Sequence, residues 1–162
     1  MLAEKEIRIL IHSVRYEVEA SLFTDADDDI IEMPADGETE PEKMQIKTVG
    51  KYTVDGDRLR ISYQESEVTG MEGSETEISF DMRDTGVVTM SRTGVVSTAL
   101  IFESGKRHHC VYQTPYMPFE VCVKTLNVKN NIGDNGCLEL DYIVEIRGAK
   151  AERTTFSMRI MD

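Results

Sequence analysis

The sequence contains little of what several common classes of protein require. Tryptophan is absent, only 7% of the 162 residues are aromatic, and the four residues Ala99–Phe102 form the longest apolar run. A membrane-spanning helix needs about 20 predominantly apolar residues, so none is expected. Platforms that stack the bases of single-stranded nucleic acid are built from aromatic side chains, of which this chain offers few.

Basic residues are scarce relative to acidic ones. The chain has 18 Lys and Arg against 30 Asp and Glu, which gives a formal net charge of −12. Surfaces that bind nucleic acid are normally basic, because their affinity depends on neutralising phosphates. We therefore expect a protein with neither a nucleic-acid partner nor a membrane partner.

The cysteines and the first residues bear on the cellular compartment. Cys110, Cys122 and Cys137 are odd in number and form no CxxC pattern, which indicates free thiols rather than a disulfide framework. The start, Met1–Glu6, lacks the basic and apolar regions of a signal peptide. These features predict a cytoplasmic protein.

The negative charge is concentrated in one segment. Residues 16–43 contain eleven acids and one base, so this segment contributes 1 − 11 = −10 and the rest of the chain −2. Its composition, interrupted by Pro34, Gly37 and Pro41, predicts an acidic flexible loop at about 24–43 within a single domain spanning 1–162. An interaction or oligomerisation module that uses the acidic 16–43 segment, for instance to form a homodimer, is one hypothesis for the function.

Apolar and polar residues alternate with a period of two along most of the chain, which indicates strands with one buried face. The clearest case is 137–147, where Leu138, Leu140 and Tyr142 share a face opposite Glu139 and Asp141. No segment shows a sustained helical period. We predict an all-β chain with strands at 5–15, 44–54, 57–65, 75–82, 86–92, 95–103, 106–114, 119–128, 137–147 and 152–161.

Short turns separate most of these strands. Asp55-Gly56 and Asn135-Gly136 supply the positive backbone φ angles that tight hairpins require. Such connections favour an antiparallel up-and-down (calycin-like) barrel of eight to ten strands, since closure removes exposed strand edges. A sandwich is the alternative, because the longer connections at 66–74 and 129–136 could cross between two sheets.

Two charged residues fall on the predicted inner face. Glu65 follows Ile61 and Tyr63 in phase, and Arg92 follows Met90. One strand lies between theirs, so in an up-and-down barrel both strands end at the same mouth. Isolated buried charges are costly whereas a hydrogen-bonded pair is tolerated, so we expect Glu65 and Arg92 to pair.

The same reasoning brings Tyr112 and Thr114 to that mouth and places Tyr142 inside the barrel. An apolar cavity with a polar entrance is typical of small-molecule sites. We predict that a small, partly apolar or anionic molecule binds in the barrel to Tyr63, Glu65, Arg92, Tyr112, Thr114 and Tyr142. A barrel filled by its own side chains, with a salt bridge at its rim, is the alternative.

No pattern in the sequence predicts a catalytic residue, a metal site or a cofactor. His108 and Cys110 share a strand face, but a third ligand is not evident. Glu65 is the single acid placed inward, without a second acid or a paired base. A non-enzymatic binding protein is therefore favoured, and an enzyme that uses Glu65 is the remaining hypothesis.

Several short motifs occur in a characteristic order: Gly50-Lys51-Tyr52, Ile61–Glu65, Thr89–Gly94, Tyr112–Tyr116, Lys124-Thr125 and Leu140–Tyr142. In this respect the chain resembles the YwiB-like bacterial family of unknown function. The resemblance covers most of the chain and implies a calycin-like (lipocalin-type) β-barrel in a bacterial cytoplasm. It implies no catalytic residues. The chain departs from the family pattern at Met117-Pro118, where a glycine is expected.

Overall fold

The computed structural model describes residues 2–19, 23, 40–65, 73–94, 96–147 and 151–161. They form ten strands and one short helix, which confirms the predicted all-β fold. The strands are β1 (Leu2–Val18), β2 (Glu42–Asp55), β3 (Arg58–Gln64), β4 (Glu75–Asp81), β5 (Asp84–Thr93), β6 (Thr98–Glu103), β7 (Arg107–Tyr112), β8 (Phe119–Asn131), β9 (Cys137–Ile146) and β10 (Ala151–Ile160), and the helix α1 (Ile132–Asn135) joins β8 to β9.

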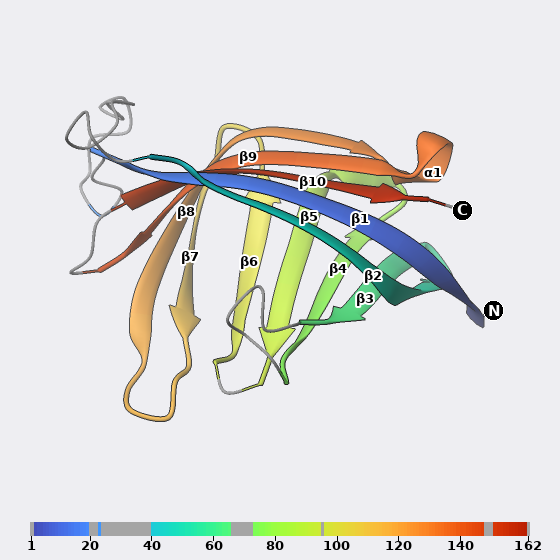
Figure 1. The fold of residues 1–162 in the computed structure, drawn as a ribbon, viewed down its shortest axis with the longest axis horizontal. Coiled ribbons are helices and arrows are strands. Elements are labelled where there is room, and N and C mark those ends of the chain that lie inside the picture. The colour runs from blue at the N-terminus through green and yellow to red at the C-terminus, as the bar shows by residue number, and fades with distance from the viewer. Residues whose placement is uncertain are drawn as a thin grey trace.

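All ten strands belong to one antiparallel sheet with the order β6-β5-β4-β3-β2-β1-β10-β9-β8-β7. Sequential neighbours pair throughout except β6 and β7, and β1 pairs with β10. Across the β6–β7 seam, Ser97 and Gln113 exchange backbone hydrogen bonds of 2.9 and 2.8 Å. The result is the nearly closed barrel predicted from the sequence, with its seam in the middle of the chain rather than at its ends (Figure 1).

The core fills the inside of the barrel with the inward set of each alternating strand. Ile7, Ile9 and Ile11 form one buried row along β1, and the rings of Phe102 and Tyr142 lie 4.6 Å apart between centroids. Burying each such side chain contributes about 1.5–3 kcal/mol. The largest fully buried side chains of this core come from five of the strands: Ile7, Ile9, Ile11, Leu59, Ile61, Ile78, Phe80, Phe102, Leu138 and Leu140.

A second, smaller cluster lies on the outer face, where Val18, Ile143 and Ala151 surround the buried Cys122. Phe23 packs against this cluster, with its ring 4.3 Å from the Arg147 guanidinium carbon. Burial raises the pKa of the Cys122 thiol. None of the three cysteines is in a disulfide. The helix in the described part of the chain is too short and too polar to cross a membrane.

Gly50 is the point at which β2 lies closest to its neighbours. A Cβ atom at this position would lie 2.6 Å from Cδ1 of Ile9 and 2.6 Å from the backbone oxygen of Ser62. We expect Gly50→Ala to lower the free energy of unfolding by about 2–3 kcal/mol, because the backbone cannot move aside without breaking the β2–β3 ladder. Urea unfolding measures this change.

Gly86→Ala is the matched control for Gly50. A Cβ there would approach nothing more closely than 4.0 Å. We expect its free energy of unfolding to stay within about 0.5 kcal/mol of the parent value. Equal stability of the two variants would show that the close approach at Gly50 has no energetic consequence.

Candidate functional site

The structure brings Glu65 and Arg92 together, as the strand phase predicts. Arg92 Nη2 lies 3.4 Å from Glu65 Oε1, and the two side chains are 18% and 3% exposed. Thr76, on the intervening strand β4, links them: its hydroxyl donates to Glu65 Oε1 at 2.5 Å and accepts from Arg92 Nε at 3.2 Å. The charged pair is therefore buried and hydrogen-bonded through a shared threonine.

Strand register sets this geometry. Tyr63 is opposite Thr76 in the β3–β4 pair, and Thr76 is opposite Arg92 in the β4–β5 pair. The backbone N–H of Glu65 donates to the Ser74 carbonyl at 2.8 Å, which fixes the chain as it leaves β3. Thr76 was not among the predicted site residues, although it shares the inward phase of Ile78 on β4.

Arg92 has more hydrogen-bond donors than it uses. A guanidinium carries five N–H groups, and those of Arg92 make two hydrogen bonds, to Thr76 and to Glu65. The other three find no acceptor among the residues that the structure describes. The Arg92 side chain is 18% exposed, so these donors are available, and this end of the barrel has the chemistry to receive an acceptor group.

Three tyrosines, Tyr63, Tyr112 and Tyr142, belong to the core of the barrel or pack against it. Burial raises the pKa of Tyr142 to about 12, and its hydroxyl is hydrogen-bonded to Thr154. Burial also raises the pKa of Tyr63 and, to a smaller extent, that of Tyr112. The positive charge of Arg92 opposes the rise in pKa for all three.

A second arginine, Arg15, approaches this region from β1. Its Nη2 and Nε donate to Glu42 at 2.6 and 3.2 Å, and its Nε lies 3.4 Å from Glu152. These carboxylates raise the pKa of Arg15, chiefly through the Glu42 hydrogen bonds. Arg15 is thus engaged, whereas Arg92 keeps spare donors. The inward phase of Ile7, Ile9 and Ile11 continues to Arg15, a signal the sequence reading did not use.

A hollow of about 230 Å³ leads to the buried pair. It opens where β3 ends and β2 continues, and Tyr63 and Glu65 form its inner wall. Its remaining lining comes from the opposing strand and from the end of β3: Gln45, Ile46, Lys47, Thr48 and Gln64. Of the six predicted residues, Tyr63 and Glu65 line this hollow, and Arg92 contacts Glu65.

The sixth residue, Thr114, has a different environment. Its hydroxyl donates to the Met117 carbonyl at 2.6 Å and accepts from the backbone N–H of Tyr116 and Met117 at 3.3 and 3.1 Å. It stabilises the turn between β7 and β8, since β7 ends at Tyr112 and the inward phase does not extend to it. The predicted loop at 24–43 lies outside the described residues except for residues 40–43 and stays a prediction.

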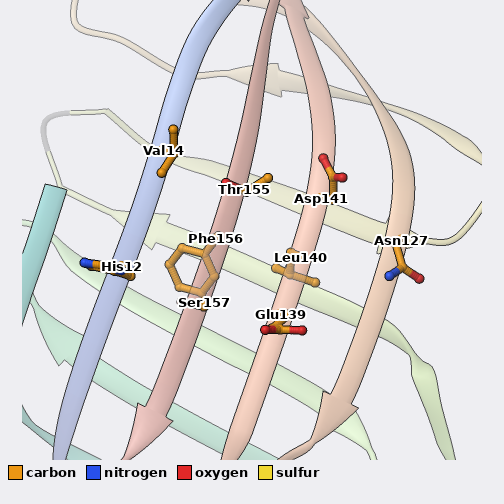
Figure 2. A pocket seen from close by; sticks show the side chains of 9 residues that line it. All are labelled: His12, Val14, Asn127, Glu139, Leu140, Asp141, Thr155, Phe156 and Ser157. Carbon is orange, nitrogen blue, oxygen red and sulfur yellow. The ribbon is translucent and has the colours of Figure 1, made fainter. Parts of the chain in front are cut away.

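A larger groove, of about 330 Å³, lies on the outer face of β1, β10, β9 and β8 (Figure 2). Its lining residues are His12, Val14, Asn127, Glu139, Leu140, Asp141, Thr155, Phe156 and Ser157. Asp141 accepts from Arg153 at 3.0 and 2.7 Å, and His12 lies 3.2 Å from the Gln45 side chain. The hollow beside Glu65 is the better candidate, because it adjoins the buried pair in which Arg92 keeps donors without an acceptor among the described residues. Among the described residues, no group of His, Cys, Asp and Glu is suited to hold a metal.

The buried pair predicts a non-additive pattern of stability. Arg92→Met leaves the Glu65 carboxylate buried without its counter-ion, so we expect the free energy of unfolding to fall by about 3 kcal/mol. Glu65→Gln added to Arg92→Met removes the uncompensated charge and should restore most of that loss. Urea unfolding of the two single variants and the double variant measures the coupling. Additive losses would contradict the pair.

The Tyr142 hydroxyl predicts a loss of stability in alkali. Its pKa is raised from 10.0 to about 12 in the folded protein, so the unfolded chain loses this proton first. The stabilisation is complete below pH 10 and is lost as the pH rises to about 12, at up to about 1.4 kcal/mol per pH unit. Urea unfolding against pH should give a shallower decline for Tyr142→Phe. Tyr116→Phe is the control, because Tyr116 is 93% exposed, and its stability should decline with pH as steeply as that of the parent protein. If stability declines as steeply in Tyr142→Phe as well, the Tyr142 hydroxyl does not cause the loss.

The comparisons with known proteins agree with this fold. The structure matches the crystal structure of YwiB from Bacillus subtilis with a TM-score of 0.69 and 18% sequence identity, over 98% of this chain and 94% of that one. No curated protein matches the sequence. Residues 30–158 match the family described as a domain of unknown function, DUF1934. The resemblance to the YwiB-like family is thus confirmed, and the chain belongs to the DUF1934 family.

Proposed function

We propose that this protein is a non-enzymatic binding protein that holds a small, partly apolar molecule by an acceptor group such as a carboxylate. The acceptor group meets the spare N–H donors of Arg92, and the rest of the ligand occupies the hollow beside Tyr63 and Glu65. The observation that carries the proposal is that the Arg92 guanidinium, whose side chain is only 18% exposed, has more N–H donors than acceptors among the residues that the structure describes.

Hydrogen-bond geometry, more than net charge, accounts for the preference. Glu65 already balances the charge of Arg92, so a second carboxylate gains little from long-range attraction. It gains from charge-assisted hydrogen bonds, which are stronger than neutral ones and are least weakened where water is excluded. Tyr63 and Ile46 offer apolar surface to the body of the ligand. A neutral alcohol of the same shape satisfies fewer of the donors.

The fold supports the proposal. Small antiparallel barrels of calycin or lipocalin type commonly enclose one small ligand, but the same fold serves many functions. The engagement of the Glu65 carboxylate by Thr76 and Arg92 favours binding over catalysis. The unpaired thiols and the likeness to a Bacillus subtilis protein support a bacterial cytoplasmic setting.

Matched acids and alcohols test the proposal by isothermal titration calorimetry. The probes are butyrate, hexanoate and benzoate, each compared with butanol, hexanol or benzyl alcohol. We expect at least one acid to bind at least tenfold more tightly than its alcohol. The double variant Glu65→Gln/Arg92→Gln, which leaves no buried charge, should lose this preference.

Arg83→Gln is the control, because it removes an exposed guanidinium paired at the surface with Asp57 and Asp81. It should keep the preference of the parent protein. The proposal is wrong if no acid binds more tightly than its alcohol, or if the double variant retains the preference.

A further inference from the structure

Among the described strands, β2 has a neighbour on only one side along half of its length. All fourteen of its residues pair with β1, but only Gly50–Asp55 pair with β3. The cause is a mismatch in length, since β3 ends at Gln64 and the chain turns away there. Figure 1 shows β2 continuing beside β1 beyond the end of β3. Within the described part of the chain, residues 43–49 have no strand on their other side.

The hollow beside this edge has the position of a missing strand. It touches four consecutive β2 residues, Gln45–Thr48, and faces Tyr63–Glu65 across the gap. Successive side chains of a strand point to opposite faces of the sheet, so a hollow in contact with all four lies along the edge of the strand and not over one face. An added strand there would meet the unpaired backbone N–H and C=O groups of β2.

The side chains along the edge specify what such a strand should carry. Lys43, Gln45 and Lys47 are exposed, whereas Met44, Ile46 and Thr48 are half-buried and point the other way. No carboxylate within the described residues pairs with either lysine. The complement of this edge is therefore an extended segment with acidic side chains on one face and apolar side chains on the other.

A second copy of this chain does not fit the same edge. In an antiparallel pair of two β2 edges, Lys43 and Lys47 of one copy would face those of the other, and like charges opposite one another destabilise a sheet. The lysines thus discourage self-pairing while they favour an acidic partner.

We propose that the β2 edge, residues 43–49, docks an extended segment of a partner protein in which acidic and apolar residues alternate. The segment adds to the sheet as a strand, with main-chain hydrogen bonds giving affinity and Lys43 and Lys47 giving selectivity. The strand occupies the same hollow as the small molecule of the proposed function. The two ligands therefore compete, but peptide binding does not require the spare donors of Arg92.

Three labelled peptides test the interaction by fluorescence anisotropy. The first is acetyl-Glu-Val-Glu-Val-Glu-Val-amide, the second has Lys in place of Glu, and the third is the acidic peptide N-methylated at alternate residues. We expect the acidic peptide to bind at least tenfold more tightly than the other two. Amide hydrogen exchange should slow at residues 43–49 on binding and stay unchanged at 50–55.

Charge-reversal variants separate the edge from general electrostatics. Lys43→Glu/Lys47→Glu should weaken binding of the acidic peptide at least tenfold and favour the basic one. The matched control Lys106→Glu/Lys129→Glu, at two exposed lysines on other strands and turns, should bind as the parent does. Glu65→Gln/Arg92→Gln should also retain peptide binding.

Any of three results would overturn the proposal. If the N-methylated peptide binds with the same affinity as the unmethylated acidic peptide, charge alone drives the interaction. In the protein without peptide, amide hydrogen exchange at residues 43–49 that is as slow as at residues 50–55 would show that the edge is already covered. Equal peptide binding by the two charge-reversal variants would show that these lysines do not select the partner.

Discussion

The pairing of β1 with both β2 and β10 is the constraint on which the rest of the structure depends. It joins the two ends of the chain within one sheet, so the barrel closes through its terminal strands and leaves its seam at β6 and β7. Because β1 extends seventeen residues, it also carries β2 beyond the end of β3. The same pairing places Arg15 beside Glu42 and Glu152. The hollow, the free edge and the second arginine all follow from the length of β1.

The period-two pattern was sufficient to predict the ten strands, the barrel and the Glu65–Arg92 pair. That pattern reports which face a residue occupies, and a meander then fixes which strand ends share a mouth. It does not report where a strand stops, and Thr114 shows the consequence: the strand ends at Tyr112 and the threonine stabilises a turn. Thr76 and Arg15 were missed for a different reason, because only the inward residues nearest the expected mouth were considered.

The free edge of β2 lay beyond sequence reasoning altogether. The predicted ranges 44–54 and 57–65 carry no register, and the structure pairs only Gly50–Asp55 with Arg58–Tyr63. Pairing register depends on contacts between strands, which hydrophobic periodicity in one strand does not encode. The turn at Asp55-Gly56 fixes where pairing begins, and the departure of the chain at Glu65, held by Ser74, fixes where it ends.

The two proposed sites use opposite solutions to the same electrostatic problem. Inside the barrel, charges are shielded from water and must be balanced, so Glu65 neutralises Arg92 and recognition relies on spare hydrogen-bond donors. On the edge, Lys43 and Lys47 stand in solvent, where salt screens their attraction over about 10 Å at 0.1 M. Raising the ionic strength should therefore weaken the edge far more than the interior. The buried site keeps its selectivity because it depends on hydrogen bonds in the interior, which dissolved ions screen much less.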